Sequence, residues 1–591
     1  MFAMIDEFDI LIKNATIVDG INKAYKGSIG IKGERIVAVG EVSGDAKQTV
    51  NAKGLTATPG FIDPHSHGDW GLPWYPKAES AILQGCTTIV AGQCGGSFAP
   101  LNEFIKPPRN LVDEIFERHP YVYYGPTLLP LDEVNEMLDA KYGWSIDWRT
   151  MEGFFKHLEN KGISINMSPL VGHGTIRFAV MGEDYKRNCT EDELEQMKEH
   201  IHRAMKEGCV GMSTGLDYDP DVFADSKEID KCVSLLKEYD GIYFPHWRRT
   251  GRRRDVKAGT RYAEPIEGIL EVINTCRETS VKLNIAHLAP GWHTIPEMTT
   301  GIAKSIGEAT VEAIDKARAE GLDITFDTIP WTCWEPFPYI CGPHFAQWLR
   351  ILGSRKELAK WLKVEEFRKR AWDDIAEGKL FQRVVINPCL NPHWAEHFKI
   401  VEHKNEEYTG VTLDEAAKKM GKDPWNALCE LIIEDPDAKG AHTDYRGHEE
   451  QMKIFYRHPY GALDLDVWIC DNKFKQKSPP WNIHLPDVFS GYTKFLINNV
   501  LESNFFTLEE AVAYCTSMPA KNVRIKDRGV LKEGYYADVV LMNLKKLAIV
   551  GPPELSNTYP KGIEYVFVNG VSVIEKGRHN GNTPGKILKR K

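Results

Sequence analysis

Short runs of apolar residues alternate with amphipathic helical stretches through the middle of the chain. The runs have the length and composition of buried strands, and they include 87–91, 163–166, 210–213, 242–244, 282–285, 324–326 and 467–469. Between them, apolar residues recur at helical spacing in stretches such as 189–206, 227–238 and 306–320. Strand–helix alternation over this length predicts a parallel sheet, and about eight such runs predict a closed (β/α)8 barrel.

The two ends of the chain carry a different pattern, in which short β-rich runs are separated by turn residues. Near the start these runs are 9–18 and 27–40, and near the end they are 537–542 and 565–574. In the last of them Asn569-Gly570 lies between apolar positions, which is a strong hairpin signal. We expect strands from both termini to build one small β-sandwich.

These patterns divide the chain into three parts. We expect residues 1–57 and 521–591 to form the β-sandwich and residues 58–520 to form the barrel. Between about 335 and 440 the alternation fades into a helical region rich in Trp, Lys and Glu. We interpret that region as an insertion that caps or borders the mouth of the active site. The predicted fold class is therefore α/β, a TIM-like barrel with two additions.

The composition is that of a soluble globular protein, with 42% hydrophobic and 26% charged residues among 591. A net charge of -10 argues against non-specific binding to nucleic acid, which needs a basic surface. No apolar run reaches the roughly 18 residues of a membrane span, and the N-terminus lacks the features of a signal peptide. The twelve cysteines show no paired spacing, so we expect them reduced in a cytoplasmic protein without a membrane partner. The sequence leaves open whether the chain forms a homo-oligomer.

His65 and His67 follow a short apolar run after a Pro-Gly turn, and they are the first candidates for chemistry. On an extended strand, residues i and i+2 point to the same face, so the two imidazoles converge. Two neutral imidazoles at one strand end can bind a divalent metal, which a single histidine cannot do alone.

Three further residues with metal-binding side chains follow predicted strands. Cys94 lies in a Gly-rich turn directly after 87–91, and a thiolate exposed there is a strong zinc ligand. His246 and His287 each follow a predicted strand, and the 41 positions between them correspond to one strand–helix unit. Because chemistry in this fold gathers at the carboxyl ends of the strands, we expect these residues to meet the His65–His67 pair.

Asp471 ends the run 466–471, late in the predicted barrel. A carboxylate on the last strand can bind the metal and accept a proton from its bound water. We therefore predict Asp471 as metal ligand and catalytic base. Asp464 and Asp466 are nearby alternatives, but they lie at the start of the predicted run, which we expect to face away from the site.

The chain resembles the amidohydrolase superfamily in this set of residues: His65, His67, Cys94, His246, His287 and Asp471, inside paired β-rich ends. Within that superfamily it resembles the N-acyl-D-amino acid deacylases. The motifs that carry this resemblance are Gly92-Gln-Cys-Gly-Gly-Ser97, Val171-Gly-His-Gly-Thr-Ile-Arg177 and Gly211-Met-Ser-Thr-Gly-Leu-Asp-Tyr-Asp-Pro220. The resemblance extends through nearly the whole chain.

The resemblance implies a tight zinc site at Cys94, His246 and His287. It implies a second, weaker metal position at His65, His67 and Asp471. Asp471 would act first as general base and then as the acid that protonates the leaving nitrogen. His173, in a Gly-His-Gly turn, is a candidate substrate contact, and a structural role is the alternative.

Residues that anchor the substrate carboxylate in this family differ in the present chain. An expected lysine is Ala289, an expected Tyr-Pro-Tyr is Ile329-Pro-Trp331, an expected serine falls at Glu335, and an expected His-Pro-Arg reads His484-Leu-Pro486. Each lost charge-assisted contact removes roughly 1.5–3 kcal/mol. We therefore expect a free α-carboxylate to be held poorly, with repulsion from Glu335, and N-acetyl-D-amino acids to react more slowly than analogues without the carboxylate.

Two features offer replacement contacts with the substrate. Aromatic residues that begin with Trp331 suggest an apolar or cation-accepting pocket, with packing under the insertion as the alternative. Five arginines lie within 248–254, directly after His246, and Arg248 is the one that the resemblance matches. They suit an anionic group placed differently, and a solvated loop or an oligomer contact is the alternative.

The sequence therefore predicts a zinc-dependent hydrolase that cleaves an amide C–N bond of a small molecule. The resemblance implies a D-aminoacylase-like enzyme with an altered substrate. The second hypothesis is a cyclic amide or imide hydrolase. The third is a non-catalytic assembly protein on the same fold.

Overall fold

The computed structural model describes residues 7–119, 128–217, 219–248, 266–289, 300–330, 335–337, 339–376, 386–389, 391–442, 448–473, 486–551 and 557–590. Seven parallel strands within these ranges form one sheet, in the order β14-β13-β12-β11-β10-β7-β6. Their bounds are β6 Phe61–Ser66, β7 Cys86–Ala91, β10 Asn166–Gly172, β11 Gly211–Gly215, β12 Ile242–His246, β13 Lys282–Ile285 and β14 Ile324–Phe326. All of their residues are buried, as expected for parallel strands covered on both faces.

An eighth segment closes this sheet into a barrel. Thr328, just after β14, pairs in parallel with Leu463, and Val467 pairs in parallel with Ser66 at the end of β6. Residues 463–467 thus lie between the two edge strands, and the predicted (β/α)8 barrel is confirmed.

Two predicted strands are displaced along the chain. The run 163–166 precedes its strand, because β10 begins at Asn166 and continues through Pro169 to Gly172. The run 467–469 is also misplaced, because the closing segment ends its pairing at Val467. The carboxyl end of the last barrel segment is therefore near 466, several residues earlier than the apolar pattern predicts.

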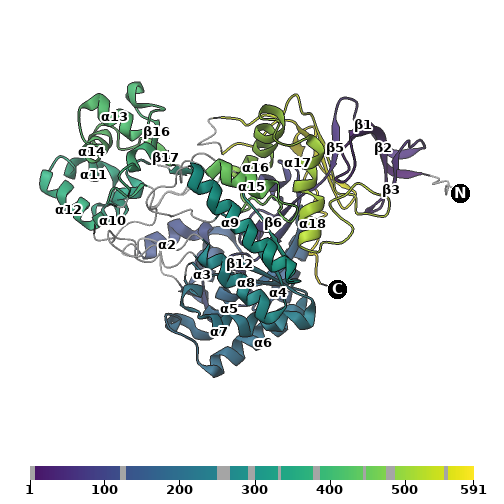
Figure 1. The fold of residues 1–591 in the computed structure, drawn as a ribbon, viewed down its shortest axis with the longest axis horizontal. Helices are drawn as coiled ribbons and strands as arrows, with labels where there is room; N and C mark the ends of the chain where they lie inside the picture. The colour runs from purple at the N-terminus through teal and green to yellow at the C-terminus, as the bar shows by residue number, and fades with distance from the viewer. Residues whose placement is uncertain are drawn as a thin grey trace.

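Helices surround the barrel (Figure 1). Those of the barrel and its connections are α1 Glu79–Ile82, α2 Val112–Arg118, α3 Leu131–Tyr142, α4 Met151–Lys161, α5 His173–Met181, α6 Glu191–Glu207, α7 Ser226–Ser234, α8 Glu267–Thr279, α9 Thr300–Ala319, α15 His448–Tyr456, α16 Asp487–Leu496, α17 Leu508–Cys515 and α18 Ser517–Asn522. The three predicted helices correspond to α6, α7 and α9. The start of α6 is fixed by a capping box, in which Thr190 and Glu193 satisfy each other's backbone amides.

Strands from both ends of the chain form one nine-stranded sheet, as expected of a domain that both termini build. Its description as a β-sandwich stays a prediction. The bounds are β1 Phe8–Ile17, β2 Tyr25–Lys32, β3 Arg35–Gly40, β4 Ala46–Asn51, β5 Thr56–Pro59, β18 Val539–Met542, β19 Ile563–Val568, β20 Val571–Glu575 and β21 Arg578–His579. The two ends are joined by β5, which pairs antiparallel with β18. Asn569 and Gly570, with φ of 50° and 77°, make the turn between β19 and β20 that the sequence predicts.

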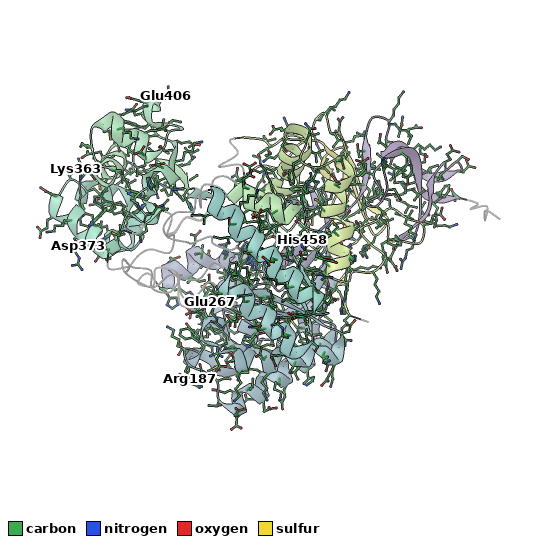
Figure 2. The ribbon with its side chains drawn as sticks, viewed as in Figure 1. Arg187, Glu267, Lys363, Asp373, Glu406 and His458 are labelled. Carbon is green, nitrogen blue, oxygen red and sulfur yellow. The ribbon has the colours of Figure 1, made fainter. Side chains whose placement is uncertain are left out.

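The helical region after the seventh strand has its own hydrophobic core, which includes Phe337, Phe398 and Leu431. It contains β15 Glu335–Phe337, β16 Phe398–Glu402 and β17 Lys439–His442 with α10 Gly342–Leu352, α11 Arg355–Trp361, α12 Glu365–Ala376, α13 Leu413–Met420 and α14 Pro424–Glu434. This insertion projects on the side of the barrel opposite to β1–β3 (Figure 1). Charged side chains such as Lys363, Asp373 and Glu406 cover its outer surface (Figure 2).

Among the described helices, none combines the length and the apolar character needed to cross a membrane.

The predicted domain boundaries at 57/58 and 520/521 stay predictions.

Candidate metal centre

The predicted histidines and Cys94 converge at the carboxyl ends of four barrel strands. The side chains come from His65 in β6, His67 just after it, Cys94 after β7, His246 at the end of β12 and His287 after β13. They form two groups of potential ligands: Cys94, His246 and His287 in one, and His65, His67, Cys94 and Asp466 in the other. Within each group the ligand atoms lie within 4.8 Å of one another, and Cys94 belongs to both.

In the first group the two sulfur–nitrogen distances are close to those around one tetrahedral ion, whereas the two nitrogens lie closer together than such an ion would hold them. The Cys94 Sγ lies 3.7 Å from His246 Nδ1 and 3.7 Å from His287 Nε2, and the two nitrogens are 2.8 Å apart. A zinc ion with bonds of about 2.0–2.3 Å places its ligand atoms about 3.5 Å apart. Thiolate and imidazole are also the ligand types that zinc prefers, so these residues fit a zinc ion.

The second group contains Asp466 and not Asp471. Its carboxylate Oδ1 lies 3.2 Å from His67 Nε2 and 3.5 Å from His65 Nε2. Asp471 is in neither group, and its Oδ1 accepts a hydrogen bond from the backbone N–H of Lys473 at 2.9 Å. The structure thus brings Asp466, and not the predicted Asp471, to the two histidines, because the closing segment ends its pairing at Val467 and leaves Asp466 at the carboxyl edge of the barrel. Which carboxylate serves as ligand and base stays a prediction.

Two buried aspartates stand behind the histidines, and the sequence argument missed both. Asp327 accepts the backbone N–H of His287 at 2.6 Å, and its Oδ1 lies 3.8 Å from His65 Nδ1. Asp217 Oδ2 lies 3.8 Å from His246 Nε2. Carboxylates in such positions fix the orientation of ligand histidines and raise their basicity. A signal for Asp327 was present, since it directly follows the predicted strand 324–326.

Burial shapes the protonation of the centre. Desolvation lowers the pKa of His65 well below its usual value, although Asp466 opposes this shift. The His65 imidazole is therefore neutral at pH 7, the form that binds a metal. Desolvation also raises the pKa of Asp327 to about 6. Because the side chains at the bottom of the metal centre are buried, an isolated charge there is unstable. A bound cation would be stabilised by the carboxylates and the thiolate, whose charge it neutralises.

The turn that presents Cys94 depends on its glycines. Cys94 itself has a φ of 53°, and Gly95 follows with a φ of 72°. A Cβ at Gly95 would lie 2.3 Å from Asp221 Oδ2 and 2.7 Å from the backbone N of Gly215. The left-handed backbone and the close approach both require glycine there, and they bring the thiol to the shared position.

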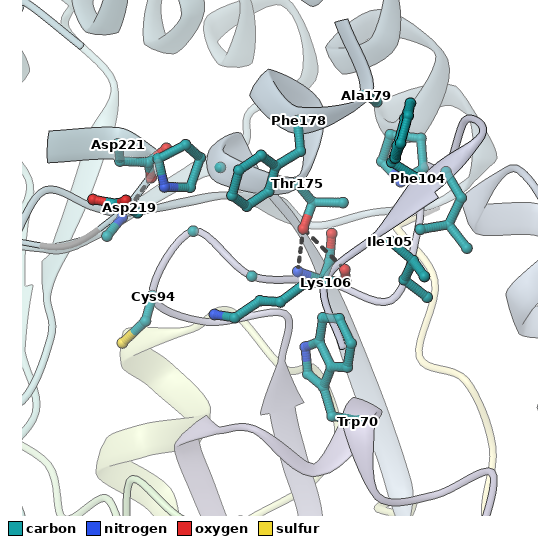
Figure 3. Close-up of a pocket in the computed structure, with 18 residues that line it drawn as sticks. Trp70, Cys94, Phe104, Ile105, Lys106, Thr175, Phe178, Ala179, Asp219 and Asp221 are labelled. Carbon is teal, nitrogen blue, oxygen red and sulfur yellow. Dashed lines mark hydrogen bonds between the residues drawn. The ribbon is translucent and has the colours of Figure 1, made fainter. Parts of the chain in front are cut away.

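A pocket adjoins the metal centre at Cys94 (Figure 3). Its cavity volume is about 30 Å³. The apolar part of its lining comes from Trp70, Leu101, Phe104, Ile105, Phe178 and Ala179. Lys106, Asp219 and Asp221 contribute charged groups. All three motifs that carry the resemblance, 92–97, 171–177 and 211–220, contribute to this lining. The part contributed by 100–106 was not predicted from the sequence.

Two of the predicted substrate contacts have structural roles here. His173 is fully buried, with Nδ1 2.9 Å from Asp221 Oδ1 and Nε2 3.2 Å from Glu228 Oε1. Arg248 donates to Glu271 and to the carbonyls of Leu216, Val222 and Ala224. Through these contacts Arg248 ties loops together, and its predicted contact with the substrate stays a prediction. For His173, the contacts with Asp221 and Glu228 favour the structural role that was the alternative to a substrate contact.

The other two predicted contacts are not placed. Trp331 lies outside the described residues, as do 249–254 of the arginine cluster. Glu335 is described only as the first residue of β15, where it pairs with His442 of β17. Ala289, in the place of the family's lysine, is buried after β13.

Comparison with known proteins found one matching family and several relatives that cover nearly the whole chain. Residues 48–225 match the amidohydrolase family. A D-aminoacylase from Alcaligenes xylosoxydans xylosoxydans is 26% identical over 586 residues, which are 99% of this chain and 98% of the relative. An N-acyl-D-glutamate deacylase from the same organism is 27% identical over 591 residues, with 99% and 98% covered.

Solved structures show the same fold. An N-acyl-D-glutamate deacylase from Bordetella bronchiseptica, complexed with zinc and a phosphonate inhibitor, superposes with a TM-score of 0.66 at 23% identity, covering 99% of this chain and all of that one. A dihydropyrimidinase from Brevibacillus agri superposes with a TM-score of 0.52 at 14% identity, with 98% of each chain covered. The part of the chain that matches the amidohydrolase family contains β6, β7, β10 and β11 of the barrel and both His65 and Cys94. The chain is similar over nearly its whole length to a D-aminoacylase and to an N-acyl-D-glutamate deacylase.

Proposed function

We propose that this protein is a zinc-dependent hydrolase that cleaves the amide C–N bond of a small N-acyl substrate. The observation that supports it most directly is the pair of ligand groups that share Cys94, with Asp466 beside the two histidines of β6. The full-length relationship to D-aminoacylases favours amide chemistry over other uses of the fold.

In this proposal Cys94, His246 and His287 hold the tightly bound ion. His65, His67 and Asp466 hold a second one. When bound, the ion activates a water molecule and polarises the substrate carbonyl. Asp327 and Asp217 keep the imidazole rings in position.

Asp466 carries the proton transfer. Its side chain is 32% exposed, so both water and substrate can reach it. The carboxylate accepts a proton from the attacking water and returns it to the leaving nitrogen when the C–N bond breaks. From the sequence alone, this role was predicted for Asp471, five positions later.

The first test is the metal content of protein purified without chelator or added zinc. We expect one or two equivalents per chain, with loss of at least one in Cys94→Ala. Hydrolysis is then measured on N-acyl amino acids, simple amides and cyclic imides. Protein that binds no metal after incubation with zinc contradicts the proposal and favours the non-catalytic alternative. Metal-loaded protein that opens only cyclic imides favours the cyclic amide hydrolase.

A further inference from the structure

The loop after β7 places the guanidinium of Arg109 one aromatic ring away from the metal centre. The Arg109 guanidinium lies over the Trp468 ring, with 4.1 Å between Cζ and the ring centroid. Trp468 in turn stacks on His67, with ring centroids 5.3 Å apart and an interplanar angle of 18°. Arg109 is thus separated from a candidate ligand by one aromatic ring, and its charge interacts with Asp466.

A second cation of the same loop faces the centre from the neighbouring pocket. Lys106 lines that pocket together with Cys94. Its side chain extends so that the amino group is directed toward Cys94 (Figure 3). Both Lys106 and Arg109 remain exposed to solvent, so a ligand can reach them.

Among the described residues, no carboxylate oxygen lies within 4.0 Å of the Lys106 amino group or the Arg109 guanidinium. The acidic groups nearest to Lys106 are occupied elsewhere. Asp219 accepts the Tyr185 hydroxyl at 2.8 Å, and Asp221 pairs with His173 and accepts the Gly215 N–H. Desolvation by the surrounding walls lowers the pKa of Lys106, and it lowers that of Arg109 to about 10. Arg109 is therefore charged at pH 7, and an anionic ligand would stabilise the charged form of both groups.

The lining beside Lys106 indicates what else the ligand carries. Phe104, Ile105 and Phe178 form an apolar wall next to the lysine. Arg109 is outside this lining, but its charge acts on Lys106. A molecule at the pocket entrance that meets both cations carries an anionic group there and an apolar group against this wall. An N-acylated apolar amino acid with a free carboxylate has this arrangement.

We propose that Lys106 and Arg109 form the anion subsite of this enzyme and bind the substrate carboxylate. The inference rests on the proposed function. It reverses the expectation drawn from Ala289 and Ile329 that a free carboxylate is held poorly. The cations come from the loop after β7 instead of the loops after β13 and β14.

The test compares an acid with its neutral analogue. The probes are N-acetyl-leucine, as each enantiomer, and its methyl ester, and the variants are Lys106→Gln and Arg109→Gln. Each variant is expected to raise KM for the acid roughly 10- to 100-fold, as for a lost charge-assisted bond, and to leave the ester nearly unchanged. Lys106→Arg should retain acid binding. Arg118→Gln is the matched control, because it removes a cation of α2 that pairs with Glu136 at the surface.

Calorimetric binding to zinc-loaded protein separates this inference from the proposed function. If neither probe is hydrolysed, but the acid binds wild type and not Lys106→Gln, the subsite is supported and the amide hydrolase proposal fails. Equal losses for acid and ester in the variants overturn the subsite while hydrolysis stands. Undetectable binding of the acid to wild type, or unchanged acid binding in both variants, also overturns it.

Discussion

At the scale of single residues, the central question is whether Asp466 or Asp471 is the carboxylate that binds the metal and transfers the proton. The two carboxylates are five positions apart, and the apolar pattern favoured the later one. Only the pairing of Val467 with Ser66 shows that the barrel edge lies at Asp466. Cys94 and the four histidines, by contrast, were identified from their positions after predicted strands, because each follows a clear apolar run.

This difference gives a paired prediction. Asp466→Asn is expected to lower kcat by about 10²- to 10⁴-fold, the usual contribution of a general base. Metal at Cys94, His246 and His287 should be retained, since Asp466 is outside that group. Asp471→Asn should leave kcat near that of wild type. Steady-state kinetics and metal analysis of both variants check this, and a severe loss in Asp471→Asn alone would restore the sequence-based assignment.

At the scale of elements, the turn after β7 determines where the thiol lies. Gly95→Ala is expected to weaken metal binding about 10- to 100-fold, as changes around ligands usually do, because the new Cβ meets Asp221 and Gly215. Gly96→Ala is the control, since the nearest atom to its Cβ is 3.6 Å away. Competition with a zinc chelator measures both affinities. Equal affinities in the two variants would show that the turn can shift without moving Cys94.

At the scale of the whole molecule, the insertion is a second folding unit with its own pH response. His344 in α10 is buried among Trp394, Phe398 and Trp425, and its Nε2–H donates to the Ile386 carbonyl at 2.9 Å. Desolvation lowers its pKa to about 4. The folded insertion therefore keeps this imidazole neutral at a pH where the unfolded chain would protonate it.

The neutral His344 imidazole therefore makes the folded insertion more stable at neutral pH than in acid. Because the folded pKa lies below the unfolded one, the stabilisation is complete above about pH 6.5 and is lost as the pH falls toward 4. The loss is about 3 kcal/mol for a shift of this size. His344→Gln should remove that part of the acid sensitivity. Urea unfolding followed by tryptophan fluorescence at pH 7 and pH 4 tests this, and identical pH dependence in both proteins would refute it.

The sequence by itself determined the barrel, the terminal β domain, the insertion and five of the six side chains in the ligand groups. It could do so because strand and helix periodicities are local, and because ligands directly follow the strands that carry them. Tertiary structure alone decided what depends on contacts between distant segments: the register that brings Asp466 to His67, and the positions of Asp327 and Asp217. It also decided that Lys106 is directed toward Cys94 and that Arg109 stacks on Trp468 beside His67. Local periodicity contains no information on such contacts, because they arise only when the barrel closes and residues some 400 positions apart become neighbours.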